Sequence, residues 1–244
     1  MVPPESLMHD GPDTYEEFHA GGLEYLKIHK DLCGLRPDEA ILDVGCGIGR
    51  KTIQLTDYMG PRGRYEGTDL VKAGVDWCTE KITSRFPNFR FTQIDVYNKW
   101  YNPTGTQRAR DYRFTFPDAT FDLLTMGSVF THMLREDIEN YLRESARVLR
   151  PGGRALISWF ILNDESLGLI ASGRSTLPFT HQVDSVTKTT NLETPEIAVA
   201  FEEKFITDLY AAAGFTIQAP IHFGSWCGRQ HFYSYQDLVY AVRN

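Results

Sequence analysis

Three glycines at alternate positions form the most distinctive chemical feature of this 244-residue chain. Gly45, Gly47 and Gly49 follow the apolar run 40–44 and precede a helical stretch that begins at Arg50. Glycine permits backbone conformations closed to other residues, and without a Cβ it lets the chain approach a ligand closely. A helix that starts just after such a loop presents free N–H groups to the ligand. The segment is therefore predicted to be a ligand-binding loop between a strand and a helix.

The glycine spacing argues against a dinucleotide ligand. A dinucleotide loop follows the pattern G-x-G-x-x-G, and Arg50 occupies the place of its third glycine. Asp43 precedes the glycines, and a carboxylate there would repel a pyrophosphate but suits a ligand that carries an ammonium group. The methionine end of S-adenosylmethionine carries an amino group and a sulfonium. An acid followed by this loop therefore fits S-adenosylmethionine better than NAD(P).

Two further aspartates follow predicted strands. Asp69 ends the strand expected at 64–69, where an acid can accept hydrogen bonds from both ribose hydroxyls, a feature shared with NAD-binding folds. Asp95 follows the strand expected at 89–94 and is placed to accept from an adenine amino group. Any one such aspartate is more often a capping or turn residue. At successive strand ends and in this order, the three acids together predict a nucleoside-binding site.

Short apolar runs alternate with helix-period segments, which is typical of an α/β fold with a mostly parallel sheet. No helical pattern separates the last two strands, so the final strand is expected to enter antiparallel. We predict a Rossmann-like, seven-stranded, mostly parallel sheet with helices on both faces. The expected strands are 40–44, 64–69, 89–94, 121–126, 154–160, 215–217 and 237–242, and the expected helices are 14–30, 50–59, 71–86, 138–149 and 201–212.

Three segments fall outside this rhythm. They are the stretch 1–38, expected to form an N-terminal helical cap, and two inserted segments, 97–115 and 163–196. In open α/β folds ligands bind at the carboxyl ends of the strands, so the insertions are expected near a substrate site there. The residues 1–244 are expected to form one domain.

Composition excludes several classes of function. The formal net charge of −7 argues against general binding to nucleic-acid backbones, which requires clustered basic residues. The cysteines are scattered without a C-x-x-C pair, and no carboxylate–histidine cluster is present, so no metal is expected. The apolar run 155–162 is too short to span a bilayer, and the first residues lack the blocks of a signal peptide. We expect a cytoplasmic protein with no membrane partner. Its oligomeric state stays open.

Five motifs in succession carry a family resemblance. They are 41–50 (ILDVGCGIGR), 67–70 (GTDL), 94–96 (IDV), 116–122 (FPDATFD) and 147–153 (RVLRPGG). In these the chain resembles the class I S-adenosylmethionine-dependent methyltransferases, especially the group with a methyltransferase type 11/25 domain. The resemblance covers roughly residues 38–160 in motif detail, and the set in this order is very specific.

The resemblance implies an S-adenosylmethionine site with a defined set of residues. Asp43 and the three glycines would surround the methionine moiety, Asp69 and Leu70 would hold the ribose and flank the adenine, and Asp95 and Val96 would bind the adenine edge. The backbone at Met126 and Gly127 would touch the methionine amino group. Because the N-terminal helix of such folds closes over the cofactor, Phe18 and Gly22 are further candidate contacts.

The chain departs from this family after Asp95. Relatives reach the F-P-D-x-x-F-D stretch in about ten residues, whereas here residues 96–113 intervene. The added segment carries aromatic side chains, so the acceptor of close relatives does not carry over to this chain.

Methyl transfer from a sulfonium is a direct displacement, so the protein mainly positions the reactants and an oxygen nucleophile also needs a base. His132 follows the fourth predicted strand and is the candidate base; a structural cap or packing role is its alternative. We predict methylation of an oxygen of a small molecule. An N-methyltransferase, a protein or RNA methyltransferase, and a non-catalytic S-adenosylmethionine-binding protein remain alternatives.

Overall fold

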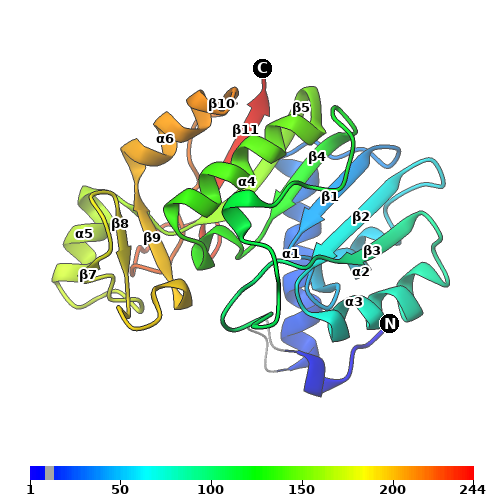
Figure 1. Ribbon diagram of the computed structural model, residues 1–244, viewed down its shortest axis with the longest axis horizontal. Helices are drawn as coiled ribbons and strands as arrows, with labels where there is room; N and C mark the ends of the chain where they lie inside the picture. The colour runs from blue at the N-terminus through cyan, green and yellow to red at the C-terminus, as the bar shows by residue number, and fades with distance from the viewer. Residues whose placement is uncertain (9–13) are drawn as a thin grey trace. The chain divides into compact units, whose positions relative to one another are not determined.

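The computed structural model describes residues 1–8 and 14–244. The chain divides into two compact units, residues 1–108 with 120–125 and residues 109–119 with 126–244. Its main sheet has seven strands in the order β10-β11-β5-β4-β1-β2-β3 (Figure 1). The predicted seven-stranded, mostly parallel sheet with an antiparallel final strand is confirmed. The single-domain expectation stays a prediction, and the two units are described in turn.

The first unit contains the strands that carry the predicted cofactor loop. β1 (Ala40–Val44) pairs in parallel with β2 (Arg64–Asp69) on one side and with β4 (Phe121–Met126) on the other, and β3 (Phe89–Gln93) pairs in parallel with β2. These strands lie within a residue of their predicted bounds. Almost every side chain of β1 is buried, as expected for a central strand whose two faces are both covered.

The helices of this unit begin with a short turn, η1 (Glu5–Leu7), and the long α1 (Tyr15–Asp31), which starts at a capping box between Thr14 and Glu17. Gly21 and Gly22 do not interrupt α1. A Cβ at Gly22 would come within 2.6 Å of the Arg50 carbonyl oxygen, so the missing side chain lets α1 pack closely on α2 (Arg50–Leu55). α3 (Lys72–Cys78) continues as a π-helical turn, η2 (Thr79–Thr83).

The second unit contributes the remaining strands of the main sheet. β11 (Asp237–Arg243) runs antiparallel to both β5 (Leu149–Trp159) and β10 (Phe215–Ile217). β5 begins five residues before its predicted start. Residues 149–153, which the sequence analysis placed outside the strand, therefore extend it. The helices of this unit in the same region are α4 (Arg135–Val148), α6 (Glu203–Ala212) and the short turn η4 (Phe130–His132).

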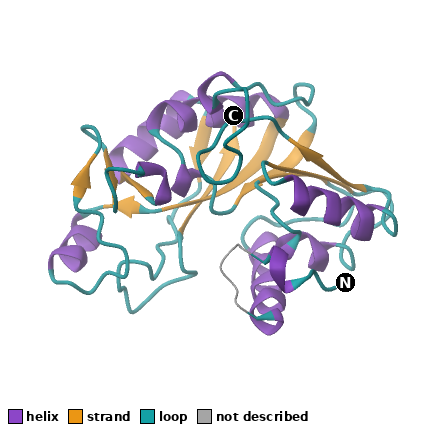
Figure 2. Ribbon diagram, turned by 60° about the horizontal axis from the view of Figure 1, so that its bottom comes forward, coloured by secondary structure: helices purple, strands orange, loops and turns teal. Residues whose placement is uncertain are grey.

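A second sheet of four strands is the main feature that the sequence did not predict. It has the order β6-β9-β8-β7, from β6 (Ile161–Leu162), β7 (His181–Gln182), β8 (Thr187–Thr189) and β9 (Val199–Glu202). α5 (Asp164–Ala171) and the turn η5 (Pro195–Ile197) belong to the same region (Figure 2). The predicted helix therefore begins at Glu203 and not at Phe201, because residues 199–201 are fully buried strand.

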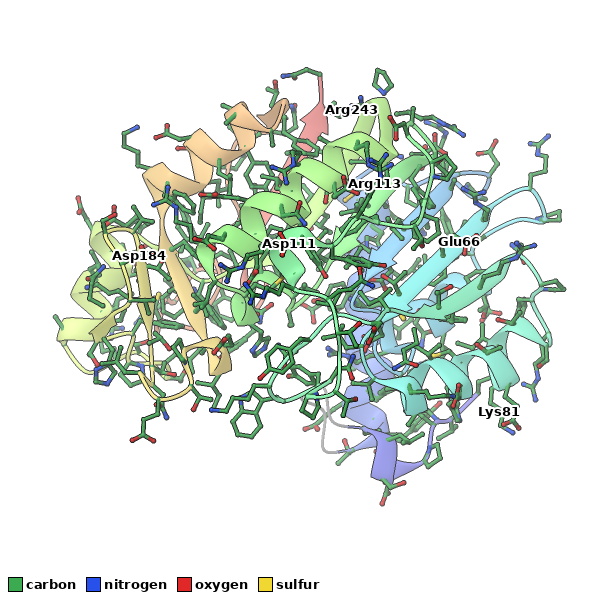
Figure 3. All side chains as sticks on the ribbon, in the orientation of Figure 1. Glu66, Lys81, Asp111, Arg113, Asp184 and Arg243 are labelled. Carbon is green, nitrogen blue, oxygen red and sulfur yellow. The ribbon has the colours of Figure 1, made fainter. Side chains whose placement is uncertain are left out.

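The later half of the segment 97–115 is fixed along α4, beside the turn η3 (Ala109–Asp111). The Asn140 side chain donates to the carbonyls of Ala109 and Tyr112, each at 2.8 Å, and the Phe114 N–H donates to Glu144 at 2.8 Å. Asp111 and Arg113 mark this segment in Figure 3. Tyr112 and Phe114 are buried, so these two aromatic side chains of the inserted segment serve as packing residues.

Candidate functional site

The predicted glycine loop lies between β1 and α2, with all three glycines in the left-handed region. Their φ angles are 78° at Gly45, 55° at Gly47 and 80° at Gly49. The N–H groups of Gly45 and Cys46 both donate to the Thr68 carbonyl, at 2.7 and 3.1 Å, which fixes the loop to the end of β2. Only glycine takes these angles without strain, so the backbone itself requires this motif.

The acid that ends β2 lies directly against the loop. One carboxylate oxygen of Asp69 accepts from the Gly47 N–H at 2.7 Å, and the other accepts from the Val71 N–H at 2.8 Å. Asp69 and the neighbouring Leu70 are both half-buried. The structure therefore brings together two parts of the predicted site, the glycine loop and the ribose-binding acid. The contacts of these residues with the cofactor stay predictions.

The acid that precedes the loop lies inside the protein. Asp43 is fully buried, with one carboxylate oxygen 3.1 Å from Lys51 Nζ and the other accepting from the Tyr65 hydroxyl at 2.7 Å. Lys51 Nζ also donates to the Gly45 carbonyl at 3.3 Å. Asp43 thus holds the loop from within the fold through Lys51. Its predicted contact with the methionine end stays a prediction.

Lys51 and Tyr65, the two partners of Asp43, are both held in their protonated forms. Burial lowers the pKa of Lys51, but the Asp43 carboxylate and the Tyr25 hydroxyl outweigh burial, so the net pKa is raised and the ammonium stays charged. Burial and the same carboxylate raise the pKa of Tyr65 well above its usual range, so this hydroxyl keeps its proton and donates it. The sequence did not single out either residue, although Lys51 stands two positions after Gly49, in the first turn of α2.

A neutral histidine lies in the same region. His29 of α1 is fully buried, its Nε2 lies 3.4 Å from the Thr125 hydroxyl, and its Nδ1 has no partner among residues 1–8 and 14–244. Burial, together with the nearby Lys51 ammonium, lowers the pKa of His29 to about 3. The imidazole is therefore uncharged at neutral pH.

The acid that follows β3 is held by the inserted segment. The exposed carboxylate of Asp95 accepts from the backbone N–H of Thr106 at 3.2 Å and from its hydroxyl, and the Gln107 N–H donates to the Asp95 carbonyl at 3.1 Å. The segment thus returns to its own starting point, and Val96 is buried there. Asp95 retains acceptor capacity for an adenine amino group. The adenine roles of Asp95 and Val96 stay predictions.

The inserted segment exposes three aromatic side chains. These are Tyr97, Trp100 and Tyr101, at relative exposures of 50%, 57% and 44%. The Asn98 side chain accepts from the backbone N–H groups of Trp100 and Tyr101, which fixes the turn between them. In contrast, the aromatic side chains of Trp159, Phe160 and Trp226 are buried in the core.

The predicted contacts from α1 are internal. Phe18 is buried at 2% exposure, and Gly22 packs on α2. Met126, the last residue of β4, is fully buried, and Gly127 follows it half-buried in the second unit. The roles of these four residues as cofactor contacts stay predictions.

The residue after Gly127 has a strained backbone. Ser128 has a φ of +62°, which costs free energy for a residue with a side chain. Its N–H donates to the Ser158 hydroxyl at 2.7 Å, and the hydroxyls of both serines donate to the Gln236 side-chain oxygen, at 3.0 and 2.6 Å. The sequence analysis missed this polar cluster. The only signal in the sequence was that Ser128 stands two residues after the end of a strand.

The geometry of His132 selects one tautomer. Its Nδ1 lies 3.0 Å from the Glu196 carbonyl oxygen, and a carbonyl oxygen only accepts hydrogen bonds. Nδ1 therefore carries the proton of the neutral ring, which leaves the lone pair on Nε2. This is the tautomer that a general base needs. Glu196 belongs to the inserted segment 163–196, so the insertion orients the predicted base.

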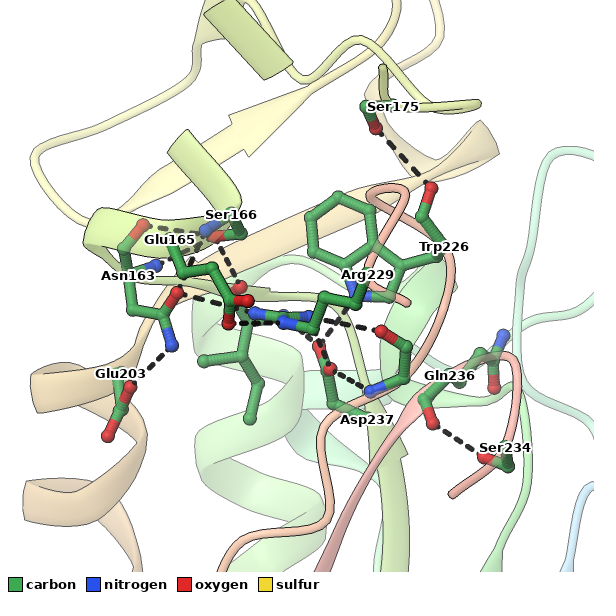
Figure 4. A network of polar contacts seen from close by, with 12 residues as sticks. Asn163, Glu165, Ser166, Ser175, Glu203, Trp226, Arg229, Ser234, Gln236 and Asp237 are labelled. Carbon is green, nitrogen blue, oxygen red and sulfur yellow. Dashed lines mark hydrogen bonds and ion pairs between the residues drawn. The ribbon is translucent and has the colours of Figure 1, made fainter. Parts of the chain in front are cut away.

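A buried charged network fixes the loop that leads to Gln236 (Figure 4). The fully buried Asp237 accepts from the Ile161 and Gly224 N–H groups and from the Trp226 indole, at 2.6–2.7 Å, and from Arg229 at 3.2 Å. Arg229 also donates to Glu165 and Asn163 of the second sheet's region. Burial raises the pKa of Asp237 to about 6.

The described parts of the chain, residues 1–8 and 14–244, contain neither a group of metal ligands nor a membrane-spanning helix. No three His, Cys, Asp or Glu side chains there are grouped in a way that could hold a metal ion. No helix there is long and apolar enough to cross a bilayer.

Comparison with known proteins begins with a family match. Residues 41–153 match a family described as a methyltransferase domain. The chain is 29% identical over 154 residues to the ubiquinone/menaquinone biosynthesis C-methyltransferase UbiE of Ectopseudomonas mendocina. That alignment covers 61% of this chain and 53% of the relative, so the chain spans about half the length of the curated relatives it matches.

Solved structures share the fold at low identity. The PH0226 protein of Pyrococcus horikoshii OT3 has a TM-score of 0.62 and 19% identity, with 99% of this chain and 96% of that one covered. A 1,6-didemethyltoxoflavin-N1-methyltransferase of Burkholderia thailandensis, solved with S-adenosylhomocysteine bound, has a TM-score of 0.58 and 20% identity, with 98% and 84% covered.

The strand order, the glycine loop with Asp69 and the matched domain agree with one another. Residues 41–153 thus form a methyltransferase domain by similarity, and the chain shares its fold with S-adenosylmethionine-dependent methyltransferases of known structure.

Proposed function

We propose that this chain transfers the methyl group of S-adenosylmethionine to a small molecule by direct in-line displacement. The observation that carries the proposal is the glycine loop, with three left-handed glycines and Asp69 hydrogen-bonded to the Gly47 N–H at 2.7 Å. A loop in which every second residue lacks a Cβ, beside a carboxylate, fits a nucleoside joined to an amino acid. The net charge of −7 favours a small acceptor over a nucleic acid.

The proposed cofactor contacts follow the order of the strands. The loop from Asp43 to Gly49 holds the methionine end, Asp69 and Leu70 hold the ribose and flank the adenine, and Asp95 with Val96 reads the adenine edge. Each carboxylate oxygen of Asp69 accepts one N–H group, from Gly47 or from Val71. A carboxylate has about four acceptor sites, so Asp69 can accept ribose hydroxyls while it keeps both of these hydrogen bonds.

When bound, the sulfonium supplies the activation: the bond from sulfur to the methyl carbon breaks as the bond from the acceptor to the methyl carbon forms. The residues of this chain must align the acceptor, exclude water and remove the proton of the acceptor. His132 is the proposed base because its Nδ1–H is held by the Glu196 carbonyl and its lone pair is therefore on Nε2.

A base of this kind favours an acceptor that must lose a proton. An oxygen acceptor, whose O–H proton would pass to His132, is the first proposal. A carbon acceptor is the second, because the relative from Ectopseudomonas mendocina is named as a C-methyltransferase. A carbon acceptor activated by an adjacent hydroxyl would need the same base. A protein that binds the cofactor without catalysis would need none.

Two variants test the role of His132. Its replacement by alanine should lower methyl transfer by on the order of 100- to 10,000-fold, the range for loss of a general base, and leave the affinity for S-adenosylhomocysteine nearly unchanged. The acceptor is found first with labelled methyl donor and candidate phenols, enols and amines. His181→Ala, which removes an exposed histidine, is the matched control. A His132→Ala variant with full activity would exclude the base role.

A further inference from the structure

We propose that Arg50 binds the carboxylate of the methionine end of S-adenosylmethionine. This inference rests on the proposed cofactor site and adds to it the partner of the cofactor's negative charge. The methionine end carries an ammonium and a carboxylate on one carbon atom. The predicted site contains acids for the ammonium and the nucleoside but assigns no cation to the carboxylate.

Arg50 stands at the end of the cofactor loop with its side chain held against α1. It is the first residue of α2, directly after Gly49, and it is half-buried. A Cβ at Gly21 would lie 3.0 Å from Arg50 Nη1, and the Arg50 guanidinium carbon lies 5.9 Å from the centroid of the Tyr25 ring. The guanidinium thus occupies a defined place between the backbone at Gly21 and an aromatic face.

The guanidinium has no anionic partner among the described residues. Within residues 1–8 and 14–244, no Asp or Glu carboxylate forms an ion pair or a hydrogen bond with Arg50. The adjacent cation differs in this respect, because Lys51 Nζ is 3.1 Å from Asp43 and also donates to the Gly45 carbonyl. Lys51 is therefore paired with a carboxylate inside the protein, whereas the Arg50 guanidinium is available to a ligand.

A half-buried cation without a counter-ion is destabilised because it has lost part of its hydration. Binding of a carboxylate ligand offsets this loss with a favourable charge interaction. Guanidinium also matches a carboxylate geometrically, since two parallel N–H groups reach two oxygens. The carboxylate shares a carbon with the ammonium proposed to lie at the loop. It must therefore lie close to the residues that border the loop. Among these, Arg50 is a cation without an anionic partner in the described residues.

The test compares three ligands that differ in the methionine end. S-adenosylhomocysteine carries both charges, decarboxylated S-adenosylhomocysteine lacks only the carboxylate, and methylthioadenosine lacks both. Their dissociation constants are measured by calorimetry with the full chain and with Arg50→Ala, Arg50→Lys and Arg85→Ala. Arg85 is an exposed arginine far along the chain from the loop and serves as the matched control.

Arg50→Ala should weaken S-adenosylhomocysteine on the order of 10- to 100-fold, as expected for loss of a charged hydrogen-bonded pair, and should leave the decarboxylated ligand within about twofold. Arg50→Lys should lie between the parent and Arg50→Ala, because lysine keeps the charge but not the fork. Arg85→Ala should change none of the three affinities.

Equal weakening of all three ligands by Arg50→Ala would overturn the proposal and show that the residue only supports the loop. No weakening would overturn it as well. If the parent chain binds none of the three ligands, the cofactor site itself fails, a result distinct from the other two.

Gly21→Ala gives a second route that does not remove the charge. Alanine is the better helix former, so α1 should not be weakened, yet its Cβ would push the guanidinium from its place. Gly21→Ala should therefore weaken S-adenosylhomocysteine more than the decarboxylated ligand, by a smaller factor than Arg50→Ala does. An unchanged preference for the carboxylate in Gly21→Ala would contradict the placement.

Discussion

Replacement of His29 by leucine should remove a large part of the loss of stability that the chain suffers between about pH 8 and pH 5. His29 is fully buried in α1, its Nδ1 has no partner in the described residues, and Lys51 is close by. The folded state therefore resists protonation of the ring. The unfolded chain does not, because its histidines are exposed to water.

The magnitude follows from the two pKa values. His29 has a pKa of about 3 in the folded protein, and an unfolded histidine has one of about 6.5. The folded pKa is the lower of the two. The contribution of neutral His29 to the free energy of unfolding is therefore fully present above the pKa of the unfolded chain, and it is lost as the pH falls below that pKa. At about pH 5 the loss is about 2 kcal/mol, and the full difference, reached only below the folded pKa, is about 5 kcal/mol.

The assay is urea unfolding of the ligand-free chain at several pH values, followed by circular dichroism. The free energy of unfolding of His29→Leu should lack the decrease of about 2 kcal/mol at pH 5. It should also be lower by the same amount at every pH, because the Thr125 hydroxyl loses its contact. His181→Leu, at an exposed position, should keep the slope of the parent. Parallel pH profiles for the parent and His29→Leu would refute the reasoning.

Three further changes test other parts of the structure. Asp69→Ala should weaken S-adenosylhomocysteine by at least about tenfold in calorimetry, and unchanged affinity would reject the ribose role. Gly49→Ala should lower the free energy of unfolding by about 1–3 kcal/mol, because Gly49 has a φ of +80° and an added Cβ would lie 3.1 Å from Cys78 Sγ; equal stability would contradict the required backbone. Asp237→Ala should cost about 3–5 kcal/mol, because Arg229 would stay buried with its charge unpaired, and a neutral result would show that the network of Figure 4 relaxes.

The sequence predicted the main sheet because its strands carry strong local signals. The run 40–44 is apolar, is followed by glycines and is central in the sheet, so hydrophobicity and position agree. Thr14 and Glu17 formed the capping box that a helix start at that point requires. Such elements are defined by residues adjacent in sequence, and sequence analysis reads them directly.

The second sheet had no comparable signal. β6 and β7 have two residues each, too few for an alternating pattern, and their partners come from other parts of the segment 161–202. The buried residues Val199 and Phe201 fit a strand or a helix equally well over so short a run. Pairing between distant residues decided the structure, and no local pattern expresses it.

The site divides in the same way. The glycines, Asp69 and the position of Asp95 were predicted from strand ends. Three of the contacts that complete the site were not, namely Lys51 with Asp43, Thr106 with Asp95 and Glu196 with His132. Each joins residues through folded loops, so only the three-dimensional structure reveals which acid is already paired and which histidine nitrogen carries the proton.

The most direct test of the central claim is a calorimetric titration of the chain with S-adenosylhomocysteine, with NAD as the competing ligand. We expect saturable binding of S-adenosylhomocysteine at one site per chain, unaffected by NAD. Binding of NAD together with no binding of S-adenosylhomocysteine would contradict it.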